Sequence, residues 1–238
     1  MLGSKSIRLL GFAAVALLYG GCASPYTFKV DAINNPDVEG YRSFKMVSSN
    51  AEFDENDLQY KEVSDYVKTT LSAQGLYEAP DTESADMIVD ISFGVGDPQI
   101  DYKTYTTPIY AVSSGGPRLV SIPIFDNKGS IIGYRSVTVY DPPRKQVVDF
   151  EEKMVPVTTY EKYLRLTARD NQNVDDSEAP AQVWSIYVNN KDESDDLRKY
   201  LPLMAAAAVP YVGASTERQK EITLKESDDE VTFVKRGM

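Results

Sequence analysis

A single cysteine, Cys22, is the feature that most limits how this chain can fold. One cysteine cannot form an intramolecular disulfide, and it excludes zinc sites built from several thiolates. The fold must therefore rest on an apolar core, and a chain of 238 residues can bury roughly 70% of the surface that its unfolded form exposes. The sequence also lacks histidine, which excludes Ser-His-Asp and Cys-His catalysis and imidazole metal ligands.

The residues that precede Cys22 have the pattern of an export signal. Lys5 and Arg8 provide a basic start, and the apolar run Leu9–Tyr19 follows with 11 residues. A membrane-spanning helix needs about 20 apolar residues, so this run fits the apolar region of a secretory signal peptide. We therefore expect residues 1–21 to be a signal peptide that is removed on export.

The segment Leu18-Tyr19-Gly20-Gly21-Cys22-Ala23 resembles the lipobox of bacterial lipoproteins, although Tyr19 stands where an aliphatic residue is usual. The resemblance implies that Cys22 becomes the first mature residue and carries fatty-acyl chains such as palmitate. It also implies delivery to the outer membrane, facing the periplasm, because Ala23 is not aspartate. The alternative is an ordinary cleavage site at which Cys22 is only a small residue.

Acidic residues outnumber basic ones, 36 to 25, which gives a formal net charge of −11. Loss of Lys5 and Arg8 with the signal peptide would bring it to −13. Binding to nucleic acid or to an anionic lipid surface needs clustered basic residues, so we expect no nucleic-acid partner. The expected contact with a membrane is through acylated Cys22 and not through charge.

Strand and helix patterns alternate along the mature chain. Apolar residues recur at every second position in 85–95, which predicts a strand. Helical spacing behind Asn56 and Asp57 predicts a helix over about 57–73, and a second helix is expected after Ser194. This order predicts an α+β fold: a mainly antiparallel β-sheet with two helices packed on one face, plus inserted β-hairpin structure.

The expected organisation is one folded domain behind a short anchor. The turn residues Asp126-Asn127-Lys128-Gly129 predict that the apolar segment 119–125 pairs with 131–140 as a hairpin. The predicted parts are a signal peptide (1–21), an anchor segment (22–25), one α+β domain (26–213) with a β insertion at about 97–160, and a C-terminal extension (214–238). The extension is predicted to form a hairpin between 222–224 and 231–234, or to be disordered.

Several segments together resemble an uncharacterised family of bacterial lipoproteins that share an α+β domain of unknown function. They are Tyr41–Lys45, Leu71–Leu76 followed by Ala85–Val89, and Val183-Trp184 followed by an acidic helix start. The resemblance spans most of residues 26–213, and the β segment from about 97 to 160 departs from it. Membership would imply an envelope-facing domain with no assigned activity and no known catalytic residues.

Two groups of acidic residues are candidate sites. The loop 169–180 carries oxygen ligands that suit Ca²⁺, although it lacks the glycine and the spacing of an EF-hand, and a solvated loop is the plainer interpretation. Asp97 and Asp101 are the pair that a carboxylate-dependent hydrolase would use, if they face one cleft. Neither pattern is specific, so we expect no catalytic residues, no bound metal and no cofactor.

The strongest candidate for an interaction surface is the apolar segment 119–125, with Leu119, Ile122, Ile124 and Phe125. Pro123 favours an edge strand, and edge strands can bind partners by strand addition. Several of the 16 tyrosines lie nearby in the sequence, and tyrosine is frequent at recognition surfaces. The alternative is that this segment covers the protein's own core.

These patterns predict a lipid-anchored cell-envelope protein whose domain acts as a non-enzymatic binding or assembly module for other envelope proteins. A second possibility is an accessory or carrier protein that binds an apolar ligand or an envelope lipid, which requires an apolar cavity of several hundred Å³. A third is a carboxylate-dependent hydrolase, which requires paired acids in a cleft.

Overall fold

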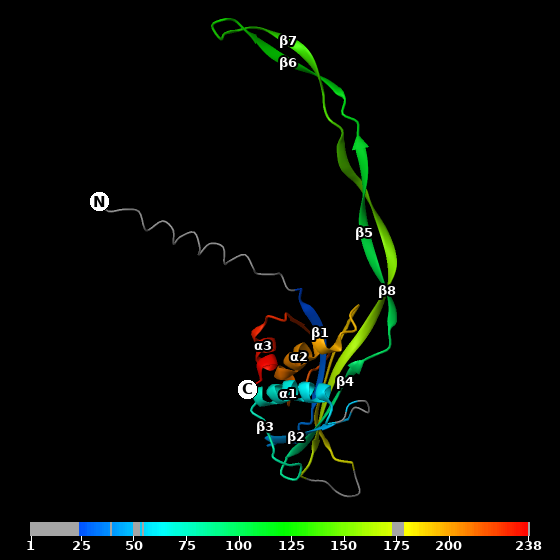
Figure 1. Cartoon of the computed structure of the whole chain (residues 1–238), viewed down its shortest axis with the longest axis vertical. Coiled ribbons are helices and arrows are strands. Elements are labelled where there is room, and N and C mark those ends of the chain that lie inside the picture. Colours follow the sequence, from blue (N-terminus) through cyan, green and yellow to red (C-terminus); the bar gives the residue numbers. More distant parts are fainter. Residues whose placement is uncertain (1–23, 39, 50–52, 54, 173–178, 238) are drawn as a thin grey trace, which may run out of the picture. The chain divides into compact units, whose positions relative to one another are not determined.

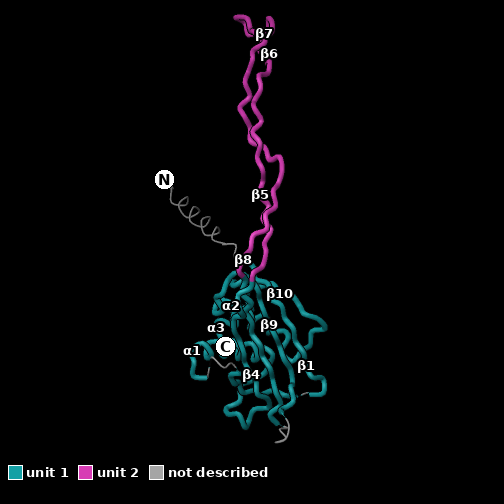
Figure 2. The backbone as a smooth tube through the Cα atoms, turned by 90° about the vertical axis from the view of Figure 1, so that its right-hand side faces the viewer, with its two compact units in different colours: residues 1–99, 159–238 teal, residues 100–158 magenta. Residues whose placement is uncertain are grey.

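The computed structural model describes residues 24–38, 40–49, 53, 55–172 and 179–237. The predicted signal peptide and Cys22 lie outside these residues. The chain divides into two compact units, which Figure 2 shows in different colours. Unit 1 comprises residues 1–99 and 159–238, and unit 2 comprises residues 100–158.

Most of the regular structure is β (Figure 1). The strands are β1 (Tyr26–Asn34), β2 (Ser43–Ser48), β3 (Tyr77–Glu78), β4 (Met87–Val95), β5 (Gln99–Ser113), β6 (Pro117–Phe125), β7 (Ile131–Tyr140), β8 (Arg144–Asp170), β9 (Gln182–Asp192) and β10 (Lys220–Leu224). The helices are α1 (Leu58–Ala73), α2 (Leu197–Ala208) and α3 (Asp229–Arg236), and a short 3₁₀ turn, η1 (Val209–Tyr211), follows α2.

The prediction of a mainly antiparallel sheet with two helices on one face is wrong. The large sheet has the order β10-β1-β9-β8-β4-β2-β3, with β5 also paired to β8, and it is mixed. β2 pairs in parallel with both β3 and β4, while β1, β8, β9 and β10 pair antiparallel. The parallel pairing arises because the chain passes from β2 through α1 before it reaches β3 and then β4, and a helical crossover returns the chain in the same direction.

The described residues contain three helices and not two. They contact one another, and α2 also contacts β1 and β9 (Figure 1). α1 begins one residue after the predicted start, and its N-cap is Asp57 and not Asn56: the Asp57 side chain accepts hydrogen bonds from the backbone N–H groups of Gln59 and Tyr60. It ends before Gly75, whose φ of +81° suits glycine.

The prediction of a hairpin in the C-terminal extension is also wrong. Residues 220–224 form β10, which pairs with β1, while 231–234 lie in helix α3. Val231 and Val234 are both buried, and a spacing of three residues places them on one face of a helix. Asp229 and Glu230 in the first turn and Lys235 and Arg236 in the last turn favour the helix through its dipole.

One apolar core lies in unit 1. Alternate residues of the central strands are buried, as in β4, where Met87, Val89, Ile91 and Phe93 are at most 1% exposed. The helices complete this core with side chains such as Val67 and Leu203. The strand alternation predicted for 85–95 is therefore confirmed.

Unit 2 consists of antiparallel strand pairs. β5 pairs with β8, which contributes residues 144–158 to this unit, and β6 pairs with β7. The hairpin predicted between 119–125 and 131–140 is confirmed. The Asp126 side chain accepts hydrogen bonds from the N–H groups of Lys128 and Ser130, and Gly129 has a φ of +81°, so local turn chemistry determines this connection.

Candidate functional site

Unit 2 exposes far more apolar surface than a folded element usually does. None of its residues is buried. Of the 25 large apolar side chains that are exposed in the described part of the chain, 20 lie between residues 100 and 158. Monomeric soluble proteins rarely expose contiguous apolar patches larger than a few hundred Å². An isolated two-stranded hairpin is also at best marginally stable in water. This unit is therefore the best candidate for an interaction surface.

The structure places all four predicted interaction residues in β6, where each is exposed, from 38% for Ile122 to 75% for Leu119. They do not share one face. Side chains alternate along a strand, so Leu119 points away from the face that carries Ile122 and Ile124. Phe125 follows a register shift in the pairing with β7.

The face that carries Ile122 continues across the hairpin onto β7. Val120 lies opposite Val137, and Val139 lies opposite Arg118 on the same face. We call this set the valine–isoleucine face: Val120, Ile122, Ile124, Val137 and Val139. Sequence reasoning missed its β7 half, although the alternation in Ser136-Val137-Thr138-Val139 is visible in the sequence.

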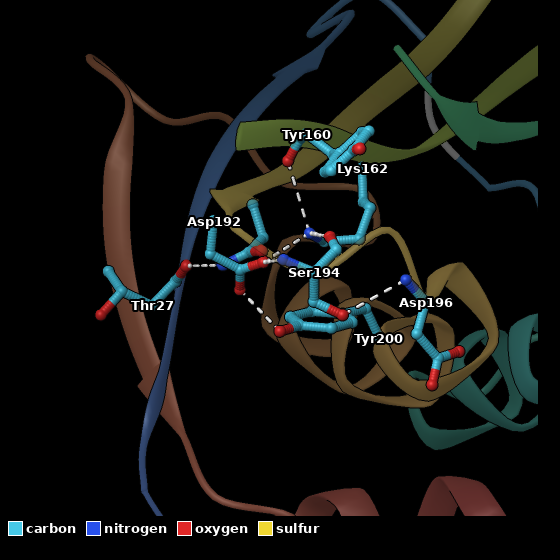
Figure 3. Close-up of polar contacts among 8 residues, drawn as sticks. Thr27, Tyr160, Lys162, Asp192, Ser194, Asp196 and Tyr200 are labelled. Carbon is cyan, nitrogen blue, oxygen red and sulfur yellow. Dashed lines mark hydrogen bonds and ion pairs between the residues drawn. The ribbon is translucent and has the colours of Figure 1, made fainter. Parts of the chain in front are cut away.

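A second candidate is a buried polar network in unit 1 (Figure 3). The Lys162 side chain is fully buried, and its ammonium lies 2.7 Å from Asp192 Oδ1. It also donates to the carbonyl oxygen of Ser194 and lies 4.3 Å from the ring centroid of Tyr200. The Tyr200 hydroxyl donates to Asp192 Oδ2 at 2.6 Å. The network ties β8 and β9 to the start of α2.

These contacts shift two pKa values. Burial by itself would raise the pKa of Asp192, but the hydrogen bonds from Lys162 and Tyr200 outweigh it and hold that pKa below its ordinary value. Burial, followed by the hydrogen bond to Asp192, raises the pKa of Tyr200 well above its ordinary value. A general acid needs a carboxyl pKa shifted upward, so the direction at Asp192 fits a structural ion pair.

Sequence reasoning missed this network, but one signal was present. Lys162 falls on the same alternate positions of β8 as Leu164, Leu166 and Ala168, all of which are buried. A lysine on the apolar face of a strand needs a buried carboxylate partner. The partner, Asp192, is 30 residues away in the sequence, so only the pairing of β8 with β9 identifies it.

Unit 1 also has a hollow of about 390 Å³. Seven apolar or aromatic residues line it, including the only tryptophan of the chain: Val38, Tyr41, Leu76, Met87, Val183, Trp184 and Val212. Polar atoms nevertheless make up the larger part of its exposed surface. Trp184 is 3% exposed, so its ring forms part of the floor and not of the rim.

The described residues of the acidic loop make local hydrogen bonds. Asp170 accepts a hydrogen bond from the Gln172 backbone N–H, and the Asn171 side chain donates to the carbonyl groups of Thr82 and Ala85. The central part of this loop, 173–178, lies outside the described residues. Asp97 belongs to unit 1 and Asp101 to unit 2.

The described residues show neither a metal-binding cluster nor a membrane-spanning helix. No group of three or more histidine, cysteine, aspartate or glutamate side chains is placed to hold a metal ion. In the same part of the chain, every helix is too short or too polar to cross a membrane.

Comparisons with known proteins add little. No protein-family model and no curated protein matches the chain. Among solved structures it is similar to a PDZ domain protein from Parabacteroides distasonis ATCC 8503, with 12% identity and a TM-score of 0.37. That match covers 85% of this chain and 40% of the other. A TM-score this low does not establish a shared fold. The resemblance to bacterial lipoproteins stays a prediction.

Proposed function

We propose that this protein is a lipid-anchored protein of the cell envelope and that unit 2 is its non-enzymatic binding element. One observation carries the proposal: 20 large apolar side chains are exposed in a unit that has no buried residue. Burial of apolar surface contributes about 25 cal/mol per Å², and this gain offsets the entropy cost of association when a partner covers the unit.

The anchor is supported by the sequence pattern that ends at Cys22. Two or more acyl chains hold a protein stably at a membrane, whereas one chain does not. An anchored domain meets its partners at a raised effective concentration, because both are confined to one surface. The site of anchoring proposed is the outer membrane, with the domain facing the periplasm.

The anchor is tested by membrane fractionation and fatty-acid labelling of the wild type and of Cys22→Ala. We expect the variant to lose both the label and the membrane association. The matched control is Ser24→Ala, two residues away, which keeps the cysteine and should behave as the wild type. Labelling of Cys22→Ala at the wild-type level would refute lipidation at this residue.

The binding element is tested by cross-linking in membranes followed by affinity capture of the full chain. We expect the double variant Ile122→Ser, Ile124→Ser to lose cross-linked species, because the valine–isoleucine face loses its centre. The control is Ile33→Ser, which changes an isoleucine of unit 1 that is 66% exposed. Equal cross-linking by all three proteins would contradict a role for unit 2.

A second candidate function is the binding of an apolar ligand or envelope lipid beside Trp184, where Val38, Leu76 and Val212 offer apolar side chains within a partly polar hollow. Its volume, about 390 Å³, lies in the range of small-molecule sites. Because Trp184 is the only tryptophan, its fluorescence reports on this hollow alone. Titration with a long-chain fatty acid should shift the emission of the wild type, and Val212→Arg should abolish the shift. An unchanged spectrum at saturating fatty acid would exclude this function.

A further inference from the structure

The two edges of the β6–β7 hairpin differ. Gly116 and Asp141, which flank the paired residues, face each other as a hydrogen-bonded pair through the Asp141 N–H and the Gly116 carbonyl. Hydrogen-bonded and non-hydrogen-bonded pairs alternate along an antiparallel ladder. The next pair, Pro117 with Tyr140, is therefore non-hydrogen-bonded, and so is the pair of Pro123 with Tyr134. The backbone N–H positions of these residues point away from the partner strand.

The row of outward N–H groups is therefore interrupted on the β6 edge and complete on the β7 edge. On β6, two outward positions are proline, and proline has no N–H to donate. On β7, the outward positions are Tyr134, Ser136, Thr138 and Tyr140, and each has an N–H. The hairpin is a two-stranded sheet, so β7 is an edge strand that can accept another strand.

The sequence of β7 suits pairing with an identical strand. Residues 131–140 contain one charged residue, Arg135, and no proline. Five of the residues in this strand are β-branched. High β-propensity, low charge and the absence of proline are typical of segments that pair with their own copies. In an antiparallel pair centred on Val137, Arg135 of each copy would face Val139 of the other, so no like charges meet.

Charge also favours a second copy at this unit. Residues 100–158 carry 7 basic and 6 acidic residues, whereas the rest of the chain carries 18 basic and 30 acidic residues. Two copies therefore repel each other through unit 1 and approach without repulsion through unit 2. A strongly basic or acidic partner would find no matching charge on unit 2.

The apolar area that unit 2 exposes is larger than one partner's share of a specific interface. If each large apolar side chain offers roughly 150 Å² and about half of it is exposed, 20 side chains provide on the order of 1,500 Å². A specific interface needs about 800 Å² from each partner. Pairing of the β7 edges buries part of this apolar area. It also makes the valine–isoleucine face continuous across the two copies.

We propose that two copies of this chain associate by antiparallel pairing of their β7 strands, which would make one four-stranded sheet from two hairpins. This inference rests on the proposed function, because it names the partner of unit 2. The occupant is a second copy, and the pairing is symmetric about the middle of β7.

The test compares two proline variants of the full chain in detergent micelles by sedimentation equilibrium. Thr138→Pro removes an outward N–H from β7 and leaves the hydrogen bonds of the hairpin in place. Ser121→Pro does the same on β6, between the two prolines already present. We expect a dimer for the wild type and for Ser121→Pro, and loss of the dimer for Thr138→Pro. A monomeric wild type, or a dimer that survives Thr138→Pro, would overturn the proposal.

A cysteine scan in native membranes provides a second readout that does not depend on proline. Single cysteines at positions 134–140 should give intermolecular disulfides with one maximum near residue 137, because a two-fold axis brings only the central residues together. A cysteine at Ser121 should give none. Equal disulfide formation at 121 and 137 would overturn the proposal.

These results separate the inference from the proposed function. If the wild type is monomeric but the Ile122→Ser, Ile124→Ser variant still loses cross-links to another protein, only self-association is wrong. If the wild type is monomeric and the double variant also leaves every cross-link unchanged, the binding role of unit 2 is wrong as well.

Discussion

Ser43 and Asp86 hold each other through a reciprocal pair of hydrogen bonds. The Ser43 backbone N–H donates to Asp86 Oδ2 at 2.8 Å, and the Asp86 backbone N–H donates to Ser43 Oγ at 2.9 Å. The same carboxylate oxygen accepts the Arg42 N–H at 2.8 Å. These bonds join the start of β2 to the start of β4, the two strands that pair in parallel.

Replacing this carboxylate should destabilise the fold. We expect Asp86→Ala to lower the free energy of unfolding by about 1–3 kcal/mol, because it leaves two backbone N–H groups without their acceptor. Urea denaturation followed by circular dichroism measures this change. Asp81→Ala is the control, because Asp81 accepts from the backbone of Ser84 in an exposed turn and should cost less. Equal losses in the two variants would contradict a special role for Asp86.

The Lys162–Asp192 pair predicts an asymmetry between its two partners. Lys162 is fully buried, whereas the Asp192 side chain is 34% exposed. Asp192→Asn leaves the buried ammonium of Lys162 without a counter-charge, so it should lower the free energy of unfolding by about 3 kcal/mol. Lys162→Met leaves a partly solvated carboxylate that still accepts a hydrogen bond from Tyr200, so it should lower the free energy of unfolding by about 1–2 kcal/mol. Urea denaturation at pH 7 measures both, and Lys199→Met serves as an exposed control. The reverse order would contradict this account.

The same pair predicts how stability depends on pH. The pKa of Asp192 in the folded protein lies below its ordinary value of 3.8. The ionised carboxylate therefore stabilises the fold above that ordinary value, and this contribution is lost as the pH falls through the folded pKa. We expect the difference in unfolding free energy between the wild type and Asp192→Asn to narrow below about pH 4. A difference that stays constant from pH 7 to pH 3 would exclude this linkage.

Gly75 predicts a purely conformational effect. Its φ is +81°, and a Cβ atom at this position would have no atom within 4 Å. Gly75→Ala should therefore destabilise the protein by about 1 kcal/mol through backbone strain alone. Gly116 also has open space but no positive φ, so Gly116→Ala should leave the melting temperature unchanged. Thermal unfolding distinguishes the two variants, and equal melting temperatures would argue against strain at Gly75.

Local patterns were enough to locate several elements. Helical spacing located α1 to within one residue at its start, and the turn chemistry of Asp126 and Gly129 identifies the β6–β7 hairpin. These signals act over a few residues, so they are readable without knowing what packs against them. The segment 231–234 shows the limit: its valines and threonine favour a strand by residue type, while the spacing of Val231 and Val234 suits the helix α3 that forms.

The sequence by itself determined the alternation in β4, the position of α1 to within one residue at its start, the hairpin turn and the absence of an intramolecular disulfide. Only the tertiary structure decided that β2 and β4 run parallel, that Asp86 binds the backbone of Ser43, and that Lys162 meets Asp192. Each of these contacts joins residues 30 or more positions apart, and chain order alone does not fix which strands become neighbours. The same holds for unit 2: a strand pattern shows which side chains alternate, but not whether a layer covers them.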